Sequence, residues 1–203
     1  MTMVDLGPQT RIVARLAASV ADEQLTAPTP CPDLGVRHLL GHLLMLSVAF
    51  RDAARKDLGT TTDTSPAATL PDIGPGWRER LPEVLDELAE AWRDPAAWTG
   101  DTRAGGVDLP GAVAGAVVAD ELVIHAWDLA RATGQAYTPD PAALDSALAF
   151  LRAAADEPTI RRSGVFGPVV PVPQDAPPLD RAVGLSGRDP RWPHRARSRA
   201  AGA

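Results

Sequence analysis

The chain has 203 residues, of which 45% are hydrophobic, and its formal net charge at pH 7 is −6. This length and apolar content suffice to bury one sizeable core, so we predict a single globular domain. The acidic balance argues against a nucleic-acid binder, because contacts to phosphates need a basic surface. No apolar run approaches the ~18 residues of a membrane-spanning helix, so we expect no membrane partner.

Cysteine usage and the N-terminus predict a cytoplasmic protein. Cys31 is the single cysteine, which excludes an intrachain disulfide and a metal cage built from cysteines alone. Residues 1–8 lack the basic and then apolar layout of a secretory signal. Cys31 lies where a helix is expected to begin, which could activate its thiol. We favour the alternative, a packed and inert side chain, because prolines flank it.

Apolar residues recur at helical spacing in five segments. The predicted helices cover residues 10–25, 34–56, 77–92, 110–133 and 141–156. Three prolines within residues 28–32 end the first of these helices, and Asp33 is placed to cap the second. Gly134 supplies a stop signal for the fourth, and Asp140 followed by proline starts the fifth. The sequence therefore predicts an all-α fold.

The segments between and after these helices are irregular. Residues 59–76 read as a long loop, and residues 94–106 break the helical pattern. Residues 164–173 are extended, apolar and rich in proline, so we expect them to pack along the surface of the bundle. A short closing helix is expected over residues 176–185. We place the domain at residues 1–187 and a basic, disordered tail at 188–203.

Histidines mark a candidate metal site on the two most hydrophobic helices. Glu121 and His125 are four residues apart, so they project from one face of their helix. A carboxylate in an apolar stripe needs a compensating positive charge, and a divalent cation would supply it. His42 is the best third ligand, because leucines surround it on the inward side of its own helix. The alternative is a Glu121 to His125 ion pair with unrelated histidines.

Two further residues are candidates for supporting the ligands. His38 lies one turn before His42 and could be a partner of a ligand, an alternative ligand or a surface residue. Asp128 could orient a ligand or make only a surface interaction. For both residues we favour the surface interpretation.

Two stretches of the sequence, PTPCPDLGVRHLLGH at residues 28–42 and DELVIHAWDLA at residues 120–130, resemble the signatures of DinB-like metal-binding proteins. The branch that they resemble is the N-terminal domain of mycothiol-dependent maleylpyruvate isomerase and its single-domain actinobacterial relatives. The segments FGPVVPVP at 166–173 and DAPPLD at 175–180 are similar to those relatives as well. The chain departs from the family pattern at Leu34, where tryptophan is frequent, and at His38, where an acidic residue is common.

The resemblance implies a DinB-like four-helix bundle, here with an additional helix and the extended proline-rich segment. It implies a divalent metal, zinc or alternatively nickel, held by His42, Glu121 and His125. It also implies mycothiol as a co-substrate and a small electrophile as the substrate of a transferase or isomerase. A metal-dependent hydrolase and a non-catalytic metal-binding sensor are the alternatives. The isomerase carries a further C-terminal domain, so we do not expect maleylpyruvate itself as substrate. Helical domains of this kind commonly form homodimers.

Overall fold

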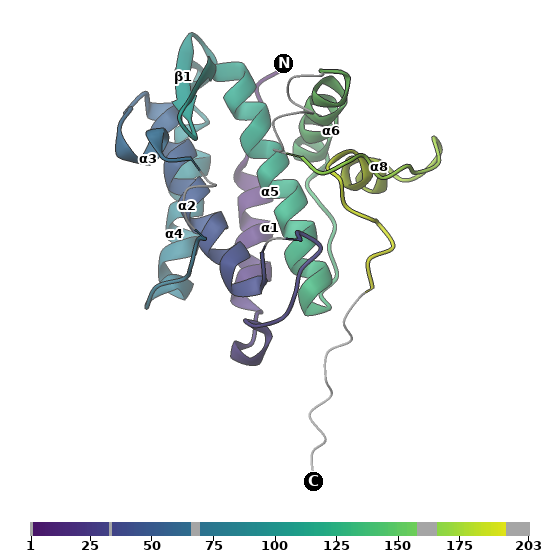
Figure 1. The fold of residues 1–203 in the computed structure, drawn as a ribbon. Coiled ribbons are helices and arrows are strands. Elements are labelled where there is room, and N and C mark those ends of the chain that lie inside the picture. Colours follow the sequence, from purple (N-terminus) through teal and green to yellow (C-terminus); the bar gives the residue numbers. More distant parts are fainter. Residues whose placement is uncertain (1, 33, 66–69, 158–165, 194–203) are drawn as a thin grey trace.

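A computed structural model describes residues 2–32, 34–65, 70–157 and 166–193. The predicted helix cap Asp33 and residues 164–165 of the proline-rich segment lie outside the described residues. The elements in chain order (Figure 1) are α1 (Gly7–Ala18), η1 (Asp22–Gln24), α2 (Val36–Arg55), α3 (Thr60–Asp63), α4 (Trp77–Ala91), η2 (Pro95–Trp98), β1 (Asp101–Ala104), β2 (Val107–Pro110), α5 (Gly111–Thr133), α6 (Pro141–Asp156) and α8 (Pro178–Leu185).

The long helices lie close to where the periodicity predicted them, and two of their ends carry the predicted capping residues. The Asp140 side chain accepts a hydrogen bond from the backbone N–H of Ala143 at 3.0 Å and so caps α6. Gly134 ends α5 in the left-handed conformation, with φ of 68°. The first predicted helix is shorter than expected: α1 ends at Ala18, and the 3-10 turn η1 covers the last part of the predicted range.

The all-α prediction needs one correction, because β1 and β2 form an antiparallel hairpin that begins in the segment predicted as irregular and ends at Pro110, just before α5. Ala104 pairs with Val107, and between them Gly105 and Gly106 have φ of 62° and 79°. Two successive residues with positive φ form the tight turn whose twist suits a hairpin, and glycine adopts that conformation readily. The fold is therefore mainly helical with a small two-stranded sheet.

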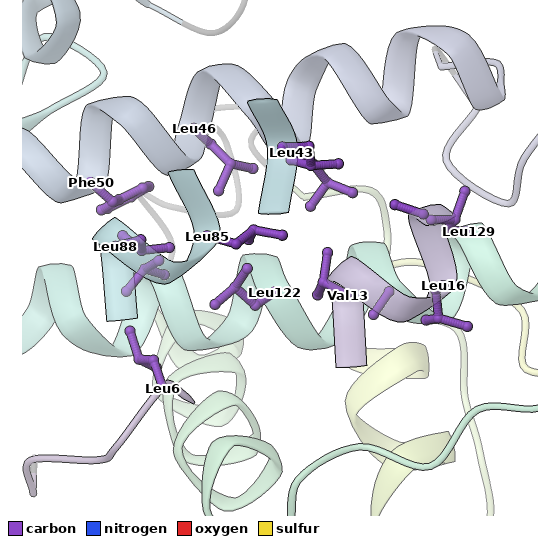
Figure 2. Packing of buried hydrophobic residues seen from close by; sticks show 14 of the residues in the cluster. Leu6, Val13, Leu16, Leu43, Leu46, Phe50, Leu85, Leu88, Leu122 and Leu129 are labelled. Carbon is purple, nitrogen blue, oxygen red and sulfur yellow. The ribbon is translucent and has the colours of Figure 1, made fainter. Parts of the chain in front are cut away.

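Four helices surround the main core: α2 contacts α4 and α5, and α1 contacts the same two. Figure 2 shows leucines of all four helices pointing toward one another, among them Leu16, Leu43, Leu85 and Leu122. α5 also contributes to a second cluster with α6 and α8, so it is covered on nearly all sides (Figure 1). Within the described ranges, no helix combines the length and apolar character needed to cross a membrane.

The described part of the proline-rich segment runs beside α8. The backbone N–H of Val170 donates to the carbonyl of Gly184 at 2.9 Å. A Cβ at Gly184 would lie 2.6 Å from the carbonyl oxygen of Val170, so the close approach requires glycine at this position. The Phe166 ring lies 6.1 Å from that of Phe150 on α6. These contacts hold the C-terminal part of the chain against the second cluster.

Truncating a core leucine is expected to destabilise the protein strongly. Leu85 is fully buried between helices, so Leu85→Ala should lower the free energy of unfolding by about 2 to 5 kcal/mol through lost burial and a cavity. Urea unfolding followed by tryptophan fluorescence measures this loss. Leu70→Ala is the matched control, because Leu70 is 60% exposed and should change stability by less than about 0.5 kcal/mol. Equal losses in both variants would contradict the core described above.

Candidate metal site

The contact between α2 and α5 brings together the three side chains that were predicted as ligands. His42, Glu121 and His125 each present one donor atom, and the three atoms lie within 4.8 Å of one another. The two imidazole rings meet edge to face, with centroids 4.8 Å apart. Glu121 and His125 face the same way because they are one helical turn apart on α5. Their role as metal ligands stays a prediction, but the juxtaposition that it requires is present.

One carboxylate oxygen lies at the centre of this cluster. The Oε2 atom of Glu121 is 3.3 Å from Nε2 of His42 and 3.0 Å from Nε2 of His125. Burial alone would raise the pKa of Glu121, but hydrogen bonds from His125 and His42 hold that pKa well below its ordinary value. Glu121 is therefore an anion at neutral pH.

The donor set fits a divalent cation in both chemistry and spacing. Two imidazole nitrogens and one carboxylate oxygen are the donors of many catalytic zinc sites. In tetrahedral coordination, ligand distances of about 2.0 to 2.2 Å place neighbouring donors roughly 3.4 Å apart. The two separations that involve Glu121, 3.0 and 3.3 Å, are close to this value, and no two donors of the group are more than 4.8 Å apart. Binding an ion would require the two histidine nitrogens to move closer together.

Asp128 lies directly behind His125. Its Oδ2 atom is 3.0 Å from Nδ1 of His125, and its side chain is wholly buried. The surface interpretation of Asp128 is therefore wrong. Burial disfavours the charged form of the ring, but hydrogen bonds to Asp128 and Glu121 outweigh this effect and raise the pKa of His125 to about 9. A carboxylate at Nδ1 holds the ring with Nε2 toward Glu121, as metal-binding histidines require.

His38 and Cys31 lie outside the cluster. His38 is half-buried on α2 and does not belong to the group of donor atoms. Cys31 is also half-buried, and its backbone N–H donates to the hydroxyl of Thr29 at 3.1 Å. Neither residue contributes a donor atom to the three-residue group.

The cluster is accessible from solvent rather than sealed in the core. The Glu121 side chain is 25% exposed and that of His42 is 13% exposed. Trp127, by contrast, is buried in the second cluster against α6 and α8, so it does not line the opening. The Glu121 side chain is therefore partly exposed, and the donor group is not enclosed in the core.

Sequence reasoning missed two buried charged residues near the cluster. Arg188 was placed in the tail, but its side chain is only 12% exposed and contacts Asp128 at 3.1 Å. Asp120 is buried, and its Oδ1 atom has no hydrogen-bond partner among the described residues. Burial and the adjacent Glu121 raise the pKa of Asp120 well above its ordinary value. The boundary at residue 188 stays a prediction, and residues 194–203 lie outside the described part.

Comparisons with known proteins show which family the chain belongs to. The chain is 29% identical over 181 residues to uncharacterized protein Rv0738 of Mycobacterium tuberculosis, covering 88% of this chain and 92% of that protein. The corresponding protein of strain CDC 1551 of the same organism matches equally. The crystal structure of the mycothiol-dependent maleylpyruvate isomerase aligns with a TM-score of 0.47 and 18% identity over 70% of this chain.

The alignment covers 65% of that isomerase chain. A crystal structure of a mutant of the same enzyme gives the same values. Residues 6–130, which include His42, Glu121 and His125, match the family model of the mycothiol maleylpyruvate isomerase N-terminal domain. The chain therefore belongs to the mycothiol maleylpyruvate isomerase N-terminal domain family.

Proposed function

We propose that this protein is a metal-dependent enzyme that uses a low-molecular-weight thiol, mycothiol, to isomerise or conjugate a small electrophile. The observation that carries the proposal is the convergence of His42, Glu121 and His125 from two helices on one partly exposed point. Family membership supplies the thiol, since mycothiol is named in the description of the family that matches residues 6–130.

The proposed metal is zinc, held by the imidazoles of His42 and His125 and the carboxylate of Glu121. A bound zinc ion supplies Lewis acidity, which lowers the pKa of a coordinated thiol and favours the nucleophilic thiolate. The protein contributes the geometry. Glu121 neutralises part of the ionic charge, and Asp128 holds the ring of His125 so that its Nε2 stays directed at the site.

The bundle supports this arrangement because both helices that carry the donors are rigidly packed. α2 and α5 contact each other, and more than half of the residues of each helix are buried, those of α5 in both clusters. Donors placed on such helices lose little conformational freedom on binding an ion, which favours a preorganised site. We propose that the packing of α1, α2, α4 and α5 is the four-helix bundle of DinB-like proteins.

Turnover is expected to require both the metal and the thiol. The test uses protein purified without a metal-affinity tag, loaded with zinc and mixed with mycothiol and a panel of small electrophiles that includes maleylpyruvate. Electrophile and free thiol are followed separately, because isomerisation regenerates the thiol whereas conjugation consumes one per turnover. Glu121→Gln should lower the rate by more than about 100-fold, beyond the 10- to 100-fold typical of residues behind the ligands.

The matched control for this assay is His38→Ala, which lies on the same helix outside the donor group and should keep wild-type activity. Turnover that persists when the thiol is omitted would contradict the proposal and indicate a hydrolase. Metal-loaded protein that turns over no electrophile with any small thiol would instead indicate a non-catalytic metal-binding module.

A further inference from the structure

The C-terminal end of α8 has a backbone geometry that determines where the next residue lies. The N–H of Arg188 donates to the carbonyl of Val183 and that of Gly187 to the carbonyl of Gly184, both at 3.1 Å. This pair of bonds is the Schellman ending of a helix, which requires a left-handed residue after the cap. Gly187 is that residue, with φ of 86°. A Cβ there would also lie 2.8 Å from Gly167, so glycine is needed twice over.

The Schellman turn directs the side chain of Arg188 back toward α5. Its Nη2 atom is 3.1 Å from Oδ2 of Asp128 and its Nε is 3.4 Å from Oδ1, so both carboxylate oxygens are contacted. The remaining nitrogen, Nη1, donates to the carbonyl of Ser186 at 3.0 Å. Because a planar guanidinium that contacts both oxygens fixes the plane of a carboxylate, the orientation of Asp128 depends on Arg188.

The same Asp128 oxygen that accepts from Arg188 also contacts Nδ1 of His125 at 3.0 Å. A continuous chain of hydrogen bonds thus runs from the end of α8 through Asp128 to a predicted ligand. Its members are buried: the Arg188 side chain is 12% exposed and that of Asp128 is not exposed. Removing Arg188 would leave the buried carboxylate without the guanidinium that contacts both of its oxygens, so it could rotate away from His125.

We propose that Arg188 is a positioning residue of the metal site, which holds Asp128 and through it fixes the orientation of the His125 ring. The inference rests on the metal site of the proposed function. It goes beyond that function because Arg188 lies outside residues 6–130, the part matched by the family model. A residue that follows α6 in the chain then supports a site whose three donor atoms come from α2 and α5.

The test compares Arg188→Ala, Arg188→Lys and the matched control Arg191→Ala in the full chain. Arg191 is three residues further along, is 88% exposed and pairs with Asp189. Zinc affinity is measured by competition with a chromophoric chelator, and site geometry by the visible absorption of the Co²⁺-loaded protein. Thermal unfolding of the metal-free variants is recorded in parallel.

We expect Arg188→Ala to weaken zinc binding about 10- to 100-fold, as for other partners of metal ligands, and to change the Co²⁺ spectrum. Arg188→Lys keeps the charge but contacts the carboxylate at one point, so it should recover part of the affinity. Arg191→Ala should match the wild type. If Arg188 only stabilised the fold, Arg188→Ala would lower the melting temperature of the metal-free protein without altering the Co²⁺ spectrum.

A second measurement keeps the inference testable if Arg188→Ala does not fold. In a double-mutant cycle, Arg188→Lys should cost affinity in the wild type but not in an Asp128→Asn background, because the effect passes through that carboxylate. Equal costs in both backgrounds would overturn the inference. The inference would also be overturned if Arg188→Ala bound zinc as tightly as the wild type or more tightly. Tighter binding would mean that the positive charge of Arg188 merely repels the cation.

Failure of the inference and failure of the proposed function give different results. If the wild type and Arg188→Ala bind zinc equally well, only the proposed role of Arg188 is contradicted. If the wild type binds neither zinc nor Co²⁺, the metal site itself is contradicted, and both proposals fail.

Discussion

Replacing His42 by alanine is expected to abolish zinc retention, whereas replacing His38, one turn earlier on the same helix, should leave it intact. His42 supplies the only donor of the three-atom group that comes from α2. Without it, Glu121 and His125 form a two-donor site, which holds zinc far more weakly than a three-donor site. We expect near-stoichiometric zinc in the wild type and in His38→Ala after dialysis, and less than about a tenth of that in His42→Ala.

Elemental analysis of protein purified without a metal-affinity tag measures this difference. Glu121→Gln should behave like His42→Ala, because the amide lacks the anionic oxygen that lies 3.0 and 3.3 Å from the two imidazoles. Circular dichroism shows whether each variant is folded. Folded His42→Ala that retains stoichiometric zinc would contradict the proposed ligand set. Equal loss in His38→Ala would show that the site lies nearer the start of α2.

Zinc affinity is expected to fall by about 100-fold when the pH is lowered from 8 to 6. In the metal-free protein the pKa of His125 is raised to about 9, since the hydrogen bonds to Asp128 and Glu121 outweigh the effect of burial. The ring therefore carries a proton over this whole range and must lose it before Nε2 can bind zinc. Each pH unit below the pKa then costs about tenfold in apparent affinity.

The same raised pKa predicts how the stability of the metal-free protein depends on pH. A folded pKa of about 9, above the ordinary 6.5, means that His125 stabilises the fold fully below pH 6.5. That contribution is lost as the pH rises through 9. The lowered pKa of Glu121 acts in the opposite sense: its contribution is present above 4.5 and is lost as the pH falls through the folded pKa. Zinc should therefore raise the melting temperature most at alkaline pH.

Calorimetric titration of zinc in buffers of different ionisation enthalpy tests this linkage, because it counts the protons released. About one proton should leave His125 per zinc bound at pH 7. His38→Ala serves as the control, and its proton count should equal that of the wild type. Zinc affinity that stays constant between pH 6 and 8 would show that no ring proton competes with the metal.

Local signals were sufficient for most of the secondary structure. The capping of α6 by Asp140 and the ending of α5 at Gly134 depend on residues adjacent in the chain, and the structure confirms both. The hairpin was missed although its Gly105 and Gly106 are a recognised turn signal. Its strands are only four residues each, too short for alternating apolar residues to be distinguished from an irregular segment.

For the candidate site too, some features could be predicted from neighbouring residues and others depend on contacts between distant parts of the chain. Helical geometry alone places Glu121 and His125 on one face, since they are one turn apart. His42 could be added from the sequence through its apolar neighbours and the family resemblance, and the packing of α2 on α5 then brings it within reach. Asp128 was misjudged because periodicity does not show which side of a fully buried helix faces the ligands.

By itself, the sequence determined the long helices, the start of α6 at Asp140, the end of α5 at Gly134 and the spacing of the two donors on α5. Each of these depends on residues within a few positions of one another. Only the tertiary structure decided that Asp128 is buried behind His125 and that Arg188, sixty residues further along, contacts it. The physical reason is that a contact over such a separation depends on the packing of α8 against the rest of the fold and on the turn at Gly187. The composition of the surrounding segment, basic and low in apolar residues, predicts a solvated tail instead.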